Sequence, residues 1–318
     1  MNILITGCAG FIGSAFALKI LKTNKKIKVI GLDNLNDFYS IKLKKKRLSL
    51  VKNSKNFKFY KIDLLDKKKL EKLFKENKID IIFNFAAQAG VRYVSSHPEK
   101  FIESNIYGFH NLIEVSKKYK ISKFFYASSS SVYGDKNKFP VSENVKLYPK
   151  NIYGLSKKMN EEYVNILLNN KTKYIGLRFF TVFGEWGRPD MLILKFLDYA
   201  RKNKEFLLNN EGNHWRDFTY IEDVVEILSM LKNKKFKKNQ IYNICSNRPI
   251  HIKKLVNYLI KKTHNKKIKN VKHNSYEAFK THGQNNKILK TVRFKKFSDF
   301  YTTVDATLKW YKEYNHLI

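Results

Sequence analysis

Residues 1–13 read MNILITGCAGFIG, an apolar run followed by a loop with glycines at positions 7, 10 and 13. This spacing is typical of the turn between the first strand and first helix of a dinucleotide-binding unit. Gly7 permits a tight turn, Gly10 lets a pyrophosphate approach the backbone, and Gly13 lets the helix pack close to the strand. The N-terminus of that helix would hold the anion. Glycines also mark ordinary strand-to-helix turns, so the pattern alone leaves both interpretations open.

A second apolar run, residues 27–32 (IKVIGL), ends at Asp33, which lies twenty residues past Gly13. In a dinucleotide-binding fold, a carboxylate at this place accepts a hydrogen bond from the 2′-hydroxyl of the adenosine ribose. The same carboxylate would repel the 2′-phosphate of NADP, because both groups are negatively charged. The sequence therefore predicts NAD as the cofactor.

The first half of the chain alternates apolar strands with amphipathic helices, which predicts an α/β fold with a doubly wound parallel sheet. We expect strands at 2–6, 27–32, 57–62, 80–85, 123–128 and 173–178, and helices at 11–23, 66–76, 98–119 and 151–169. The carboxyl ends of such strands meet at one edge, where Gly7, Asp33, Ala86 and residues 128–131 fall. Asp63, just past a strand, either caps the adenine pocket or shares a helix N-cap with Asp66.

After Phe180 the alternation becomes irregular, which predicts a second, smaller and mostly helical lobe that binds the substrate. We expect residues 1–180 to form the Rossmann domain, with 216–246 returning to its sheet. Residues 181–215 and 247–318 then form the lobe. No Pro- or Ser-rich linker separates the parts, so they are expected to pack together.

The composition, 43% hydrophobic and 28% charged, is that of a globular domain. Two cysteines, Cys8 and Cys245, provide no disulfide framework. The sequence contains no apolar run near 18 residues and no signal-peptide pattern, so we expect no membrane segment and a cytoplasmic location. No metal site is predicted.

The formal net charge is +36, and basic proteins often bind nucleic acids. Lysines are scattered along the whole chain and no recognition motif is present, so we expect no specific nucleic-acid partner, only non-specific adhesion to polyanions at low salt. Only eight of the 63 basic residues are arginine. Arg92, Arg178, Arg188 and Arg216 lie within motifs, which indicates sites where a two-pronged donor is needed for phosphate or carboxylate.

Tyr153 and Lys157 stand in the sequence YGLSK, and their spacing places both side chains on one helix face. A neighbouring ammonium and a positive nicotinamide ring favour the phenolate, which makes the tyrosine a general base near neutral pH. A Tyr/Lys pair alone usually lies on the protein surface and has no catalytic role. Here it follows a strand that ends in YASSSSVYG (126–134) and the glycine loop, and this context favours the catalytic interpretation.

The chain resembles the extended short-chain dehydrogenase/reductases, the NAD-dependent nucleotide-sugar epimerase/dehydratase family, over essentially its whole length. The matching motifs are TGCAGFIG (6–13), Asp33-Asn34, FAAQAG (85–90), SSSSVYG (128–134), YGLSK (153–157) and RDFTY (216–220). The resemblance implies that Tyr153 is the base, that Lys157 binds the nicotinamide ribose and tunes Tyr153, and that Ser129 bridges substrate and base. The implied NAD contacts are Gly7, Gly10, Phe11, Ile12, Gly13, Asp33, Asn34, Asp63, Leu64, Ala86, Ala87, Tyr153 and Lys157.

The two residues after Ser129 separate the branches of this family. Sugar 4,6-dehydratases resemble one another in having Asp-Glu there, and UDP-glucuronate decarboxylases keep a Glu at the second position. This chain has Ser130 and Ser131. Without the carboxylates, no evident group expels a hydroxyl from carbon 6, which favours simple epimerisation.

Four stretches resemble the UDP-glucuronate 4-epimerases more closely, namely 33–40, 86–93, 177–191 and 216–224. This resemblance implies that Thr181, with Ser129 and Ser130, holds the sugar carboxylate, and that Arg188 and Arg216 face the nucleotide and its diphosphate. Arg92 is either a further carboxylate partner or part of a surface salt bridge. Glu185 stands where these enzymes usually have proline, and residues 281–294 lack the usual Gly-Asp and aspartate features, so sugar choice and nucleotide contacts stay open.

The leading hypothesis is therefore an NAD-dependent isomerase that inverts carbon 4 of a UDP-hexuronate, UDP-glucuronate to UDP-galacturonate, for surface polysaccharide synthesis. The alternatives are a 4-epimerase of UDP-glucose, UDP-galactose or an N-acetyl form, a UDP-glucuronate decarboxylase or sugar dehydratase, and a non-catalytic NAD-binding regulator. The resemblance also implies a homodimer built on helices 98–119 and 151–169. Its apolar residues, Ile102, Ile106, Phe109, Leu112 and Ile113, would be divided between the sheet and the partner.

Overall fold

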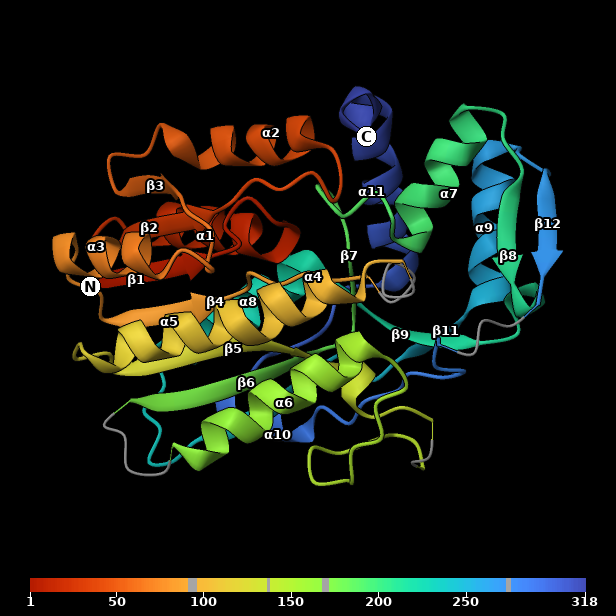
Figure 1. Cartoon of the computed structure of the whole chain (residues 1–318). Helices are drawn as coiled ribbons and strands as arrows, with labels where there is room; N and C mark the ends of the chain where they lie inside the picture. The colour runs from red at the N-terminus through yellow and green to blue at the C-terminus, as the bar shows by residue number, and fades with distance from the viewer. Residues whose placement is uncertain (91–95, 136–137, 168–171, 273–275) are drawn as a thin grey trace.

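The computed structural model describes residues 1–90, 96–135, 138–167, 172–272 and 276–318. Within them, a seven-stranded sheet forms the centre of the molecule (Figure 1). Its strands are β1 (Asn2–Thr6), β2 (Lys28–Asp33), β3 (Phe57–Lys61), β4 (Ile81–Asn84), β5 (Lys123–Ser129), β6 (Lys173–Phe179) and β10 (Gln240–Ile244). Its strands are all parallel, in the order β10-β6-β5-β4-β1-β2-β3. The chain winds outward from β1 and then from β4 in opposite directions, which confirms the predicted doubly wound architecture.

Helices cover both faces of this sheet. One face carries α1 (Phe11–Thr23), α8 (Ile221–Leu231) and α10 (Asn286–Val292), and the other carries α3 (Lys67–Glu76), α5 (Gly108–Lys117) and α6 (Ile152–Ile166) (Figure 1). In β1, Ile3 and Ile5 face the first layer and Leu4 faces the second. Because both faces are buried, the strands read as near-continuous apolar runs.

Two helical segments differ from the prediction. The sequence analysis missed α2 (Ile41–Lys52), a lysine-rich helix whose N-cap, Ser40, accepts a hydrogen bond from Leu43 N. The helix expected at 98–119 is α4 (Pro98–Ile102), a π-helical turn η1 (Glu103–Tyr107) and α5. The extra residue of the π-turn changes which side chains point inward.

Beyond Phe180, strand β9 (Trp215–Tyr220) and helix α10 lie in parts of the fold other than those expected. β10 pairs with β6 and returns to the sheet as predicted, but β9 joins β7 (Thr181–Phe183) and β11 (Pro249–His251) in a separate three-stranded sheet. Helix α10 packs against β10 and α8, although the prediction assigned it to the lobe. Both placements depend on pairing between distant segments, which apolar periodicity does not reveal.

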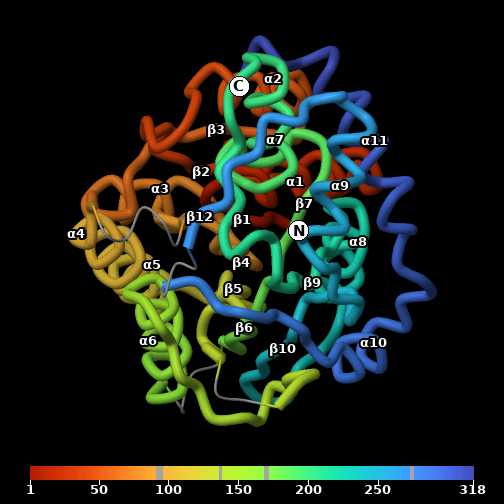
Figure 2. Tube along the Cα trace, turned by 90° about the vertical axis from the view of Figure 1, so that its right-hand side faces the viewer, coloured from red at the N-terminus to blue at the C-terminus, as the bar shows by residue number. Residues whose placement is uncertain are grey.

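The lobe has its own apolar core between α7 (Leu192–Arg201), α9 (Ile252–Thr263) and α11 (Phe300–Tyr314). It also contains two parallel strands, β8 (Phe206–Asn209) and β12 (Ile268–Val271). Figure 2 shows the molecule from the side of this lobe, with α7, α9 and α11 in its upper part. No helix among the described residues is both long and apolar enough to cross a membrane.

Candidate active site

A cavity of about 960 Å³ lies at the carboxyl ends of the central strands, between the sheet and the lobe. The glycine loop forms one wall. Gly7 has φ +66°, and a Cβ on it would lie 2.7 Å from the Ala86 backbone nitrogen, while a Cβ on Gly13 would lie 2.2 Å from the Gly7 carbonyl oxygen. Only glycine fits these two positions. The close-packed loop at the N-terminus of α1 therefore suits a pyrophosphate, as NAD requires.

Asp33 ends β2 and lines the same cavity. Its Oδ2 accepts a hydrogen bond from Ala9 N (3.0 Å) and its Oδ1 accepts one from Leu35 N (2.8 Å). Burial raises the pKa of this carboxyl, while these backbone donors and the nearby Lys44 and Arg47 oppose the rise. Asp33 thus fixes the glycine loop as well as facing the cavity, a second role that the sequence did not reveal.

Asn34 and Asp63 lie beside Asp33 in the cavity wall. Asn34 Nδ2 donates to Asp63 Oδ2 (2.7 Å), and Asp63 Oδ1 accepts from Leu65 N (2.9 Å). The N-cap of α3 is Asp66, whose Oδ1 accepts from Lys69 N (3.0 Å). The alternative interpretation of Asp63 as a shared N-cap is therefore wrong, because Asp66 caps the helix alone.

The remaining predicted NAD contacts also lie in the cavity wall. They come from the start of α1, the loop after β3 and the loop after β4. These residues are Gly10, Phe11, Ile12, Leu64, Ala86 and Ala87.

Tyr153 and Lys157 stand on the first turns of α6, and both line the cavity. Lys157 Nζ lies 5.9 Å from the centre of the Tyr153 ring. Burial lowers the pKa of Lys157 to about 8 and raises the pKa of Tyr153. A hydrogen bond with Ser129 and the charge of Arg188 lower the pKa of Tyr153 in part. Desolvation is the largest effect on the pKa of this phenol, and Ser129 and Arg188 oppose it. The expected stabilisation of the phenolate by Lys157 together with a nicotinamide ring stays a prediction.

All four serines of the run line the cavity, and Ser128 also has a structural contact. Ser128 points into the protein and donates to Glu161 Oε1 (2.5 Å), which also pairs with Arg178. Arg178 therefore pairs with an internal carboxylate and is not among the described residues that line the cavity. Ser129 Oγ accepts from Ser131 N (3.1 Å), the second residue of the short 3-10 turn η2 (Ser130–Val132).

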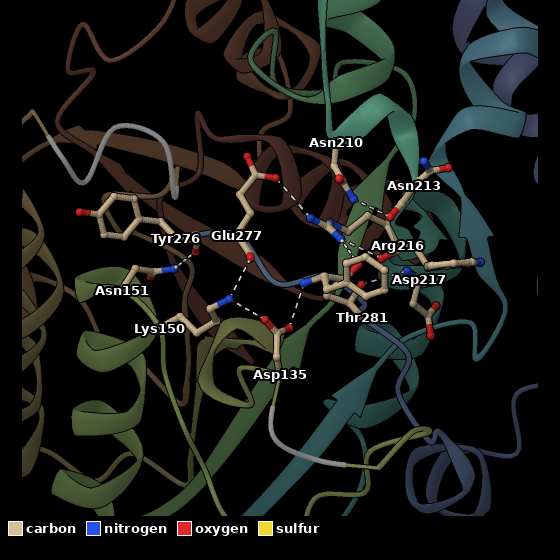
Figure 3. Close-up of polar contacts among 12 residues, drawn as sticks. Asp135, Lys150, Asn151, Asn210, Asn213, Arg216, Asp217, Tyr276, Glu277 and Thr281 are labelled. Atoms are coloured by element: carbon tan, nitrogen blue, oxygen red, sulfur yellow. Dashed lines mark hydrogen bonds and ion pairs between the residues drawn. The ribbon is translucent and has the colours of Figure 1, made fainter. Parts of the chain in front are cut away.

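Three predicted substrate residues from the second half of the chain meet in this cavity, namely Thr181, Arg188 and Arg216. Arg188 is held by Asp190 through Nε (3.0 Å) and Nη2 (2.5 Å). Arg216 pairs with Glu277 at 3.2 Å (Figure 3). The predicted Arg92 lies outside the described residues.

Residues 276–281 connect the lobe side of the cavity to the catalytic helix (Figure 3). Asn151 is the N-cap of α6, because its Oδ1 accepts from Gly154 N (2.8 Å), and its Nδ2 donates to the Tyr276 carbonyl oxygen (2.9 Å). Asp135 accepts from Phe279 N (2.9 Å). The segment that carries Glu277 is therefore bonded directly to the helix that carries Tyr153.

Two further positioning residues were missed by the sequence analysis. Asn105, in the π-helical turn, donates to Gln88 O and to Ser156 Oγ, both at 3.0 Å, and so joins α6 to the loop after β4. Arg47, on α2, is completely buried between the glycine loop and the loop before α7. Asn105 could have been identified from the sequence as a polar residue among the apolar positions of a predicted helix. Arg47 could have been identified because arginine is rare in this chain.

Glu185, the residue that departs from the expected proline, is explained by a local contact. Tyr220 Oη donates to its two carboxylate oxygens at 3.0 and 2.8 Å. Among the described residues, Glu185 is not part of the cavity wall. The substitution therefore leaves the lining of the site unchanged.

Residues 3–245 match the NAD dependent epimerase/dehydratase family. Protein CapI of Staphylococcus aureus is 37% identical to this chain, with 99% of each chain covered. UDP-glucuronate 4-epimerase 4 of Arabidopsis thaliana is 34% identical, over 99% of this chain and 76% of that protein. The structure of UDP-glucuronic acid 4-epimerase from Bacillus cereus, in complex with UDP-glucuronic acid and NAD, has a TM-score of 0.92 at 28% identity and covers 98% of this chain and 99% of its own.

The chain therefore belongs to the NAD-dependent epimerase/dehydratase family. It is an NAD-dependent epimerase, as the sequence predicts, and its cofactor is NAD.

Proposed function

We propose that this enzyme inverts carbon 4 of a UDP-hexuronate and converts UDP-glucuronate to UDP-galacturonate. The observation that carries the proposal is the lining of one cavity by three hydroxyl side chains, Ser129, Ser130 and Thr181, next to Tyr153. Hydroxyls donate hydrogen bonds to a sugar carboxylate without adding negative charge. The names of the Arabidopsis and Bacillus relatives support the same substrate.

Asp33, the glycine loop and Lys157 all line the cavity. Asp33 would bind the adenosine ribose of NAD, the glycine loop its pyrophosphate and Lys157 its nicotinamide ribose. Bound NAD accepts a hydride from carbon 4 of the sugar and returns it, so the reaction has no net redox change. Tyr153 takes the proton of the carbon 4 hydroxyl as the hydride leaves, and Ser129 holds that hydroxyl against the phenol. The phenol later returns the proton to the inverted sugar.

Inversion requires the 4-keto sugar to turn about its diphosphate linkage so that its other face receives the hydride. Arg188 and Arg216 would hold the nucleotide and diphosphate, because guanidinium groups bind phosphate oxygens in a fixed, two-pronged geometry. Both line the cavity on the lobe side. The nucleotide then stays fixed while the sugar alone rotates.

A hexuronate adds a difficulty, because a ketone at carbon 4 makes the carbon 6 carboxylate part of a β-keto acid that can lose carbon dioxide. Ser129, Ser130 and Thr181 would stabilise the charged carboxylate and hold the scissile bond away from the orientation that overlaps the ketone. Ser131 stands where a glutamate would repel that carboxylate. We therefore expect little pentose product.

Lack of an Asp-Glu pair at positions 130–131 disfavours a dehydratase, and the hydroxyl set disfavours a neutral sugar. The test is to incubate the pure NAD-bound enzyme with UDP-glucuronate, UDP-glucose and UDP-N-acetylglucosamine separately and to identify the products by NMR. UDP-galacturonate should form fastest. Faster inversion of a neutral sugar, or UDP-xylose as the main product, would overturn the substrate assignment.

We further propose a homodimer and a role in surface polysaccharide synthesis, while the cytoplasmic location stays a prediction. Five apolar residues were expected to be divided between the sheet and the partner. Of these, Phe109, Leu112 and Ile113 are buried in the chain's own core, Ile106 is partly buried and Ile102 is exposed. Other exposed apolar side chains on the same two helical segments are Tyr107, Leu155, Met159 and Ile166. These residues would form the contact.

A further inference from the structure

Among the described residues, Arg47 is one of the largest side chains that the fold buries completely. It uses four hydrogen bonds. Nε donates to Trp186 O (2.9 Å), Nη1 to Ala9 O (3.2 Å) and Tyr39 Oη (2.6 Å), and Nη2 to Gly187 O (2.8 Å). A fork of this kind fixes the positions of its acceptors, because the guanidinium is planar and rigid.

The acceptors of Arg47 belong to both ligand subsites. Ala9 lies in the glycine loop, and its N–H binds Asp33 Oδ2. Gly187 directly precedes Arg188 in the loop between β7 and α7. Hydrogen bonds thus link Asp33 to Ala9, Ala9 to Arg47, and Arg47 to Gly187, the residue before Arg188. The first of these residues is proposed to bind the adenosine ribose, and Arg188 the nucleotide sugar.

The loop before Arg188 holds a backbone conformation that needs outside support. Trp186 has φ +60°, in the left-handed region that residues other than glycine seldom adopt. Such a residue persists where its surroundings impose the conformation. Here the surroundings are Arg47, which binds the Trp186 carbonyl, and the rings of Trp310 and Tyr314, whose centres lie 5.1 and 4.7 Å from that of Trp186.

The charge of Arg47 is also incompletely matched by the protein. Among the described residues, no carboxylate lies within ion-pair distance of it, and all four acceptors are neutral. Tyr39 and the Asp33 carboxylate favour the charged guanidinium, whereas burial and the cations Lys44 and Arg188, which both line the cavity, oppose it. A buried cation without a paired anion is costly. The pyrophosphate and diphosphate of the two ligands would supply the missing negative charge.

We infer that Arg47 is a positioning residue that couples the NAD-binding loop to the nucleotide-sugar subsite, so that each ligand strengthens the binding of the other. By linkage, the coupling must act equally in both directions. The inference rests on the proposed role of Arg188 in holding the nucleotide. Arg47 itself touches neither ligand's reacting atoms.

The test is Arg47→Lys, which keeps the charge but cannot donate to acceptors in both loops at once. We expect the variant to retain less than half of the NAD of the wild type after gel filtration. The KM for UDP-glucuronate and the Kd for UDP, measured on NAD-loaded protein, should each rise on the order of tenfold or more, with kcat changed much less. A matched control is Arg201→Lys, because Arg201 also donates to a tyrosine hydroxyl but joins only lobe side chains.

A merely structural arginine would lower the melting temperature of Arg47→Lys and leave its NAD content, KM and UDP affinity at wild-type values, and that result would overturn the inference. Arg188→Ala separates the inference from the proposed function. If Arg188→Ala weakens UDP binding while Arg47→Lys does not, only the coupling is wrong. If Arg188→Ala binds UDP normally, the role assigned to Arg188 is wrong, and the coupling to it is overturned as well.

A measurement on the wild type applies even if Arg47→Lys does not fold. Hydrogen exchange of a peptide covering residues 184–190 is compared with and without NAD, in the absence of any nucleotide sugar. We expect NAD to slow exchange in this peptide, because Arg47 transmits order from the glycine loop. Unchanged exchange would contradict the coupling.

Discussion

At the residue scale, the proposed reaction requires that the phenol of Tyr153 loses its proton and that the ammonium group of Lys157 stays protonated. Desolvation works against both, since it raises the pKa of Tyr153 and lowers that of Lys157 to about 8. Ser129 and Arg188 favour the phenolate. Removal of either neighbour should therefore make Tyr153 harder to deprotonate.

Replacement of Tyr153 by Phe should remove most turnover, on the order of hundreds-fold or more, because it deletes the general base. The fold and the bound NAD should be unaffected, since Phe keeps the ring and its packing against Phe101. The measurement is initial rate on UDP-glucuronate, with NAD content as the control. Near-normal epimerisation by Tyr153→Phe would show that the proton leaves by another route.

The pH dependence of kcat should be bell-shaped. As pH rises, more Tyr153 loses its proton, and the rate increases. Burial lowers the pKa of Lys157 to about 8, so above about pH 8 this residue loses the charge that is proposed to stabilise the phenolate and hold NAD, and the rate should fall. The profile is measured between pH 6 and 10 while NAD content is monitored. A rate that stays level to pH 10 would rule out the charged form of Lys157 as a requirement.

Thr181→Ala or Ser130→Ala should increase the fraction of decarboxylated product. Each removes one hydroxyl that would restrain the sugar carboxylate, so the β-keto acid can reach the orientation that loses carbon dioxide. The ratio of UDP-pentose to UDP-galacturonate is measured by NMR. Ser122→Ala, at an exposed serine at the opposite end of β5, is the control. An unchanged ratio in both site variants would mean that other groups restrain the carboxylate.

At the scale of elements, α4, η1 and α6 expose apolar side chains that the chain itself does not cover, and the proposed dimer would bury them. Leu155→Asp should therefore shift the protein from dimer to monomer in sedimentation equilibrium at micromolar concentration. Leu50→Asp, at an exposed leucine on α2, should not do so. A wild-type monomer under these conditions would contradict the proposal.

The sequence predicts an element well when neighbouring residues determine it, and poorly when it depends on segments far apart in the chain. The strands of the main sheet follow from local apolar runs, and their predicted bounds differ from the observed ones by only a residue or two. Helix α2 was missed because its lysines mask the buried Leu43, Leu48 and Val51. The three-stranded sheet could not be predicted, because β7, β9 and β11 pair across more than thirty residues.

The site residues likewise divide into those that lie in contiguous motifs and those whose role depends on segments far apart in the chain. Tyr153, Lys157 and the glycine loop stand in contiguous motifs, so spacing and family resemblance sufficed to locate them. Arg47 contacts Ala9 on one side and Gly187 on the other, 38 and 140 residues away in the chain. Such a role is visible only once both loops have been placed.

At the scale of the whole molecule, two lobes enclose one cavity that would take two anionic ligands. Cationic side chains line it from both sides, with Lys44 and Lys157 from the Rossmann domain and Arg188 and Arg216 from the lobe side. The segment 276–281 and Arg47 each connect these sides. Carboxylates such as Asp33, Asp190 and Glu277 line the same cavity, so the net charge of +36 is spread over the chain and is not concentrated at the site.

The central claim is that carbon 4 is oxidised and reduced again within one cavity while the carboxylate is retained. The most direct measurement is the NMR time course of UDP-glucuronate with NAD-bound enzyme in deuterium oxide, without added cofactor. We predict UDP-galacturonate that keeps its hydrogen at carbon 4, because the hydride is returned and does not exchange with solvent, and almost no UDP-pentose. Deuterium at carbon 4, or a pentose as the main product, would contradict the account.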